Sequence, residues 1–194
     1  MSISLLETAY QLFDEANAKD PNQEIVEGKE IPKELIYGQR MTQTLSSFQP
    51  DASEVVKLAC RCQHICRWEI PRDSYPMDRV GYLRWREELK KFHATKAAGI
   101  LEKVGYTQDV IDRVSFLLQK KKLKKDPESQ LLEDVICLVF LAFYYEPFIA
   151  KHEEKKVVSI LQKTWNKMSE KGHEAALKLS FSEKGLHLIK IALS

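Results

Sequence analysis

The chain has 194 residues, of which 44% are hydrophobic and 30% are charged, and its formal net charge at pH 7 is +2. This length allows one domain with a substantial core and is too short for two full ones. The near-neutral charge disfavours a nucleic-acid partner. No apolar run reaches the ~20 residues that span a bilayer, so no membrane partner is expected. The first residues lack a basic region and include Glu7, which is untypical of a secretory signal and indicates a cytoplasmic protein.

Taken in chain order, the sequence predicts helices separated by short polar spans. Apolar residues recur at helical spacing over 3–18, and Pro21 lies just beyond that helix. The span 20–32 is polar and is expected to be a loop. Further helices are expected from after Pro32 to about Phe48, from Ser53 to about Cys66, from about Gly81 to Gly105, from Thr107 to Leu118, from Asp126 to Tyr145, and over 152–168, 172–178 and 182–193. No alternating run demands a sheet and no internal repeat is evident, so we expect an all-α, single-domain bundle of about eight helices over 1–194.

Arginines and aromatic residues are concentrated around the loop expected over 67–79. Arginine forks bind phosphate or carboxylate in a bidentate manner, and aromatic rings can stack on a ligand. A small anionic molecule is therefore the expected partner, although nearby acids offer internal ion pairs as an alternative. The candidate substrate-binding residues are Arg61, Arg67, Arg79, Trp68, Tyr82 and Arg86.

Histidines and carboxylates in predicted helices suggest a metal centre. His64, His93 and Asp134 would supply two imidazoles and a carboxylate, a set that suits Zn, Mn, Fe or Ni and leaves positions open for water. Glu133 diverges from Asp134 by ~100° on a helix and is not expected to share the ion. It would then either hydrogen-bond a metal ligand or act as a general base. The alternatives are a core role for His64, a surface turn for His93, and stabilisation of the helix dipole by the two acids. No motif indicates an organic cofactor.

Three cysteines lie near His64 in the sequence. Cys60, Cys62 and Cys66 do not share one helix face, and the chain lacks the second ligand pair of a structural zinc site. We therefore expect buried thiols.

Four segments together resemble HD-type metal phosphohydrolases. They are residues 37–41, 58–65, 92–101 and 131–135, and the resemblance covers about 33–145. It implies an HD-like core over 33–145 with packing extensions over 1–32 and 146–194, and Asp134 as the last metal ligand. Tyr37 stands where the first His is expected, and Gln63-His64 stands where His-Asp is expected.

The chain also resembles, over nearly its whole length, a family catalogued as a domain of unknown function, number 4202, which implies no particular activity.

Two functions follow from these patterns. One is a metal-dependent phosphohydrolase acting on a small phosphorylated substrate such as a nucleotide. The other is an inactive HD-like module that binds an anionic ligand or a partner protein through an Arg/aromatic pocket.

Overall fold

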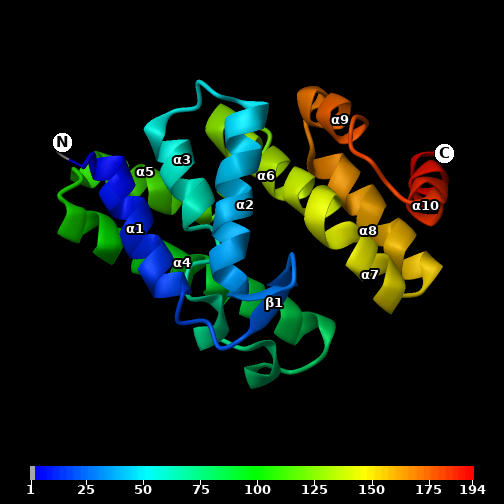
Figure 1. The fold of residues 1–194 in the computed structure, drawn as a ribbon, viewed down its shortest axis with the longest axis horizontal. Coiled ribbons are helices and arrows are strands. Elements are labelled where there is room, and N and C mark those ends of the chain that lie inside the picture. The colour runs from blue at the N-terminus through cyan, green and yellow to red at the C-terminus, as the bar shows by residue number, and fades with distance from the viewer. Residues whose placement is uncertain (1–2) are drawn as a thin grey trace. The chain divides into compact units, whose positions relative to one another are not determined.

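The computed structural model describes residues 3–194 and divides the chain into two compact units, the first ending at Lys121 and the second running from Lys122 to Ser194. Over the described residues the structure is mostly helical, with ten α-helices (Figure 1), and the all-α prediction is confirmed. The helix count exceeds the eight expected. The single domain over 1–194 and its HD-like core over 33–145 stay predictions.

The first unit contains five α-helices and two short 3₁₀ turns, and most helices begin where the sequence places a cap. Ser4 and Glu7 form a reciprocal capping box, while Ser53 and Asp78 cap later helices with their side chains. The elements are α1 (Leu5–Asn17), α2 (Lys33–Phe48), α3 (Glu54–Arg61), η1 (Arg67–Glu69), η2 (Arg72–Ser74), α4 (Arg79–Val104) and α5 (Gln108–Leu118).

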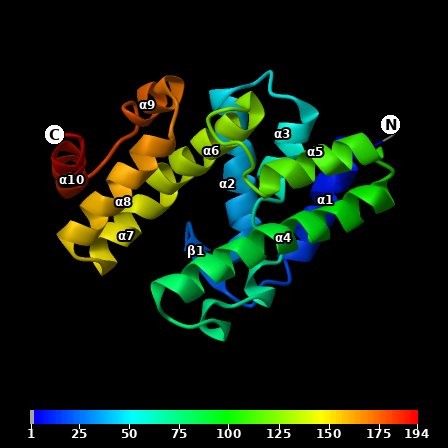
Figure 2. The same cartoon turned by 180° about the vertical axis from the view of Figure 1, so that it is seen from behind.

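The long helix α4 ends at Gly105, whose positive φ of 98° suits a residue without a Cβ, and α5 then packs alongside α4 (Figure 2). Side chains from all five helices fill the core of this unit, among them Phe13, Met41, Val56, Leu101 and Val114.

His64 lies outside any helix, contrary to expectation. Helix α3 ends at Arg61, and residues 62–66 form a turn that leads into η1. A distant side chain holds this turn, because Asn17 accepts a hydrogen bond from the backbone N–H of Cys66, whose φ of 51° is left-handed. This contact spans 49 positions, so periodicity could not reveal it.

The expected loop over 20–32 contains a β-hairpin. Strands β1 (Gln23–Val26) and β2 (Lys29–Pro32) pair antiparallel, with Val26 opposite Lys29. The two turn residues, Glu27 and Gly28, both have positive φ, as a tight hairpin turn requires. The strands have only four residues each and are largely exposed, so the alternation that normally predicts a strand is weak here.

The second unit is helical throughout its regular elements. They are α6 (Pro127–Val139), the π-helical turn η3 (Phe140–Tyr144), α7 (Tyr145–Lys151), α8 (Glu154–Lys167), α9 (Glu170–Ala176) and α10 (Glu183–Leu193). The π turn divides the helix that was expected to continue to Tyr145, which accounts for part of the larger helix count. Tyr145 is fully buried, and its hydroxyl donates to the carbonyl of Gly185, 3.0 Å away. Among the described residues, no helix has the length and apolar character needed to cross a membrane.

Candidate functional site

A group of polar side chains lies close together inside the first unit. They come from α2, from the turn after α3, from η1 and from α4. We call this group the His64 cluster: Glu34, Tyr37, Gln63, His64, Arg67 and His93. Most buried polar side chains bond to one another, to the backbone or to water, so their contacts indicate the protonation state of each one.

His64 is held as a neutral imidazole between a carboxylate and a guanidinium. Its Nε2 lies 3.1 Å from Nη1 of Arg67. Because a guanidinium only donates, Nε2 accepts this bond and the ring proton is on Nδ1. Nδ1 lies 3.3 Å from Oε2 of Glu34, and the Tyr37 ring stacks on the imidazole at 4.1 Å between centroids. Burial and the charge of Arg67 hold the pKa of His64 well below its usual value.

His93 is also neutral, and one of its nitrogens is open. Its Nδ1 lies 2.8 Å from the carbonyl oxygen of Ile65, which can only accept, so Nδ1 carries the proton. Nε2 is buried and has no hydrogen-bond partner among the described residues. Burial, followed by the proximity of His64, lowers the pKa of His93 to about 3. The side chain is 4% exposed, so the surface position considered for His93 is wrong.

Tyr37 and Gln63 occupy two places where the HD-type resemblance expects histidine ligands. In the structure they bond to each other, with the Tyr37 hydroxyl donating to Oε1 of Gln63 at 3.0 Å. A neutral phenol–amide pair therefore stands beside His64, where the resemblance would place imidazoles.

Positive charge is in excess around His64. Besides Arg67, the cations Lys33, Arg86 and Lys120 all depress the pKa of His64. The carboxylate within the cluster is Glu34, whose own pKa burial raises in spite of Arg67. A positive field of this kind opposes a further cation and favours an anion.

Aromatic rings border the arginines of this region. The Arg67 guanidinium lies over the Trp85 ring at 4.9 Å from its centroid, and Trp85 donates to the carbonyl of Ile70. Arg86 donates to the Tyr82 hydroxyl at 3.2 Å, and Arg72 lies 5.9 Å from the Tyr82 ring centroid. Tyr82 is 42% exposed. The structure thus brings Arg67, Tyr82 and Arg86 into one region, as the sequence suggested, and adds Arg72 and Trp85.

Other predicted substrate-binding residues lie elsewhere or make other contacts. Arg61 forms a two-pronged ion pair with Asp14, in which Nε lies 2.8 Å from Oδ1, and it stacks on Tyr10. The guanidinium group of Arg61 is therefore engaged in an ion pair that joins α3 to α1. Trp68 is half-buried in η1, and Arg79 is exposed as the first residue of α4.

Asp134 and Glu133, the predicted carboxylates of the metal centre, belong to the second unit. Oδ1 of Asp134 accepts from the backbone N–H of Ser169 at 2.8 Å and from Nε2 of Gln130 at 3.1 Å. Oδ2 accepts from the Ser169 hydroxyl at 2.6 Å. Glu133 lies 3.3 Å from Nζ of Lys167. Asp134 thus anchors the start of α9.

Over residues 3–194, no group of three or more His, Cys, Asp or Glu side chains is arranged to hold a metal ion. The lone pair of His64 Nε2 accepts from Arg67, and that of His93 Nε2 is open. The predicted metal site of His64, His93 and Asp134 stays a prediction.

The anchor at Asp134 has a counterpart that the sequence analysis missed. The tetrapeptide Ser-Glu-Lys-Gly occurs at 169–172 and again at 182–185. In the second copy, Glu146 accepts from the N–H and the hydroxyl of Ser182 at 2.9 and 2.8 Å. In both copies the serine hydroxyl also accepts from the glycine N–H of its own tetrapeptide. The tetrapeptide is a repeated helix start that a carboxylate from an earlier helix holds in place.

The four cysteines are free and buried, which confirms the expected thiols. Burial raises the pKa of Cys60 and Cys62 strongly and that of Cys66 to about 11. Because the thiolate is the reactive form, we expect native protein to react with Ellman's reagent at least ~100-fold more slowly than protein in denaturing urea. One fast-reacting thiol equivalent in native protein would contradict this burial.

Comparison with family profiles gives one match: the profile described as "Domain of unknown function (DUF4202)" matches residues 7–189. The chain belongs to this family. Comparisons with curated proteins and with solved structures found no match. The second resemblance seen in the sequence is therefore confirmed, and the HD-type resemblance gains no support.

Proposed function

We propose that this member of the DUF4202 family binds a small phosphorylated molecule at the arginine and aromatic side chains beside the His64 cluster. One observation carries the proposal: the Arg67 and Arg72 guanidinium groups both lie over the Trp85 ring, at 4.9 and 5.8 Å from its centroid, beside the His64 cluster. An anionic ligand would bind favourably to two guanidinium groups held this close together.

Arg67 is the residue best suited to contact the anion. Its Nε lies 3.9 Å from Oε1 of Glu34, too far for the bidentate hydrogen bonding that a carboxylate usually makes. The guanidinium is stacked on Trp85, so its orientation is set before a ligand arrives. The side chain is 29% exposed, and solvent therefore screens its charge only in part. A fixed, partly desolvated fork binds phosphate more strongly than a mobile surface arginine.

The aromatic residues favour a phosphorylated ligand that also carries a flat ring, such as a nucleotide. Tyr82 has an exposed ring beside Arg72 and Arg86. A base could stack on Tyr82 while its phosphate meets the arginines, and stacking of this kind contributes ~1–3 kcal/mol.

The test compares Arg67→Gln with Arg84→Gln by isothermal titration against phosphate, pyrophosphate, AMP, ATP and a sugar phosphate. Arg84 is exposed on the same helix as Arg86 and, over residues 3–194, makes no hydrogen bond, ion pair or ring contact with the cluster, so it controls for loss of one positive charge. The wild type should bind at least one of these ligands. Loss of a charge-assisted bond of ~1.5–3 kcal/mol should weaken that binding roughly 10- to 100-fold in Arg67→Gln. Equal losses in both variants, or no binding by the wild type, would refute the assignment.

A metal-dependent phosphohydrolase is the second candidate, and the open lone pair of His93 Nε2, with the His64 ring 5.9 Å away between centroids, favours it. In this proposal His93 and His64 of the first unit would be ligands of the ion. Elemental analysis after incubation with Zn, Mn, Fe or Ni separates the two candidates. Stoichiometric metal that His93→Ala removes would support the hydrolase, and absence of metal would support anion binding alone.

A further inference from the structure

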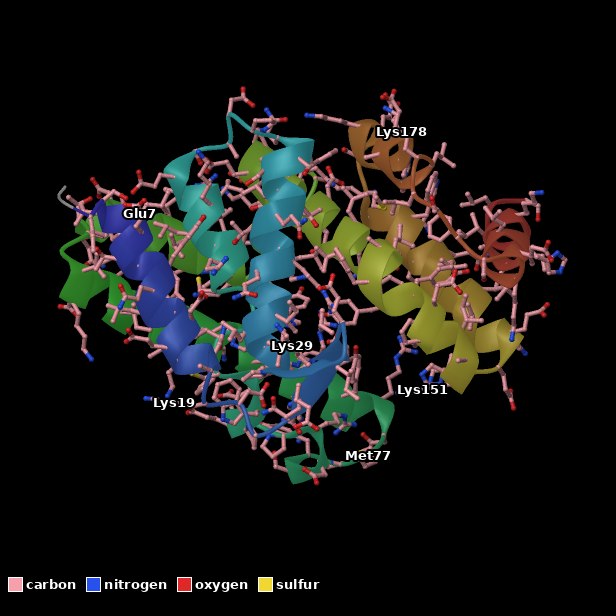
Figure 3. All side chains as sticks on the ribbon, in the orientation of Figure 1. Glu7, Lys19, Lys29, Met77, Lys151 and Lys178 are labelled. Atoms are coloured by element: carbon pink, nitrogen blue, oxygen red, sulfur yellow. The ribbon has the colours of Figure 1, made fainter. Side chains whose placement is uncertain are left out.

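Large apolar side chains are exposed where η2 leads into α4. Met77 is 76% exposed, Val80 58% and Leu83 57%. Met77 lies at the outer edge of this loop in Figure 3. The three side chains follow one another at intervals of three residues, and exposed apolar side chains gathered in this way commonly mark a contact with another macromolecule. We call Met77, Val80 and Leu83 the α4 patch.

The α4 patch lies on a rigid support. Arg72 donates to the carbonyls of Tyr75, Pro76 and Asp78 at 3.1, 2.7 and 3.2 Å, which ties the loop to one conformation. Oδ1 of Asp78 accepts from the N–H of Gly81 at 2.7 Å. Gly81 packs so closely that a Cβ there would lie 2.0 Å from the carbonyl oxygen of Pro76. A patch fixed in this way is preorganised for binding, because little conformational entropy remains to be lost.

The charges beside the patch identify what can cover it. Arg79, Leu83 and Glu87 are spaced four residues apart, so they follow one another along a single exposed face of α4. Opposite charges thus stand one turn to either side of an apolar centre. A two-fold axis through Leu83 would place Arg79 of each copy opposite Glu87 of the other. The pattern is complementary to itself, as a symmetric dimer interface requires.

Glu87 is available for such a pairing. It lies 2.9 Å from Lys90 within its own helix, and its side chain is 59% exposed. Exposed pairs of this kind contribute at most ~1 kcal/mol, so Glu87 can exchange partners at low cost.

We propose that a second copy of this chain docks on the α4 patch, with the two α4 helices antiparallel and Leu83 packed near its counterpart. The patch is smaller than the interfaces of permanent dimers, so the expected dissociation constant is on the order of 10–100 µM. Arg67 is not part of the α4 patch, so the Arg67→Gln and Leu83→Lys variants test the two proposals separately.

The experiment is sedimentation equilibrium of the full chain at concentrations from about 5 to about 500 µM. The wild type should show a monomer–dimer equilibrium that Leu83→Lys abolishes. Arg79→Glu and Glu87→Arg should each weaken the dimer about tenfold or more, because like charges then face each other. The double variant Arg79→Glu/Glu87→Arg should restore the dimer to within about threefold of the wild type. All three substituted positions are exposed, and circular dichroism would verify folding of the four variants.

Only the rescue by the double charge swap distinguishes the antiparallel α4 dimer from a dimer that forms through another surface. A wild type that remains monomeric would overturn the proposal and leave the patch to a different protein. A dimer that ignores Leu83→Lys, or whose charge swap fails to restore it, would also overturn the proposal, because the contact would then lie on another surface.

Discussion

Asp134→Ala is expected to lower the free energy of unfolding of the second unit by ~3 kcal/mol. The carboxylate is 3% exposed and accepts three hydrogen bonds, two from Ser169 and one from Gln130. Each such bond contributes about 1 kcal/mol net, and bonds to a charged acceptor contribute more. Gly172 packs against the same carboxylate, since a Cβ there would lie 2.7 Å from Oδ1. Urea unfolding followed by far-ultraviolet circular dichroism measures the loss, and faster amide hydrogen exchange in α9 would locate it.

Glu146→Ala is the matched control, because Glu146 holds Ser182 in the same geometry. That contact is at the surface, where water replaces the lost acceptor, so we expect a loss of about 1 kcal/mol. The difference between the two losses in the free energy of unfolding therefore measures how much burial strengthens the same hydrogen-bonding motif. Unchanged stability in Asp134→Ala would mean that the carboxylate is not an anchor, and would strengthen its predicted role as a metal ligand.

Helix positions were predictable because the signals for them are local. Expected helices over 152–168 and 182–193 correspond to α8 (Glu154–Lys167) and α10 (Glu183–Leu193) within two residues at each end. Capping serines and apolar periodicity act within one or two turns, so a single sequence contains them. Departures occur where the backbone takes unusual forms. The lysine run after α5 has positive φ at Lys120, Lys122 and Lys124, and the helix expected from Asp126 to Tyr145 contains a π turn.

The site was predictable only in part, because side-chain partners come from distant positions. Arg67, Tyr82 and Arg86 were identified from composition, yet nothing local showed that Arg61 would pair with Asp14 across 47 positions. Glu34 was missed altogether. It follows Pro32 at a helix start, where an acid ordinarily interacts with the dipole in solvent, whereas tertiary packing leaves it 6% exposed against His64.

Acid should destabilise the first unit, and His93 should account for a measurable share of that loss. The pKa of His93 is about 3 in the folded chain and about 6.5 when unfolded. Between these values the unfolded state binds more protons, so stability falls as pH decreases, by ~1.4 kcal/mol per pH unit for this residue. His64 has a pKa lowered in the same direction and adds to the slope. Glu34 opposes them, since its raised pKa means that the folded state binds the extra proton above pH 4.5.

Because these groups titrate together, the informative quantity is the difference between wild type and His93→Gln. The amide of glutamine can still donate to the carbonyl of Ile65 and cannot be protonated. Urea unfolding at pH 7, 6, 5 and 4 should show a variant whose stability falls less steeply, with the gap in slope near ~1.4 kcal/mol per pH unit below about pH 6.5. Parallel curves would show that His93 titrates normally, which would require its ring to reach solvent. An ion or a hydrogen-bond donor bound at Nε2 would instead lower the folded-state pKa of His93 further, and the wild-type loss of stability would then continue to lower pH.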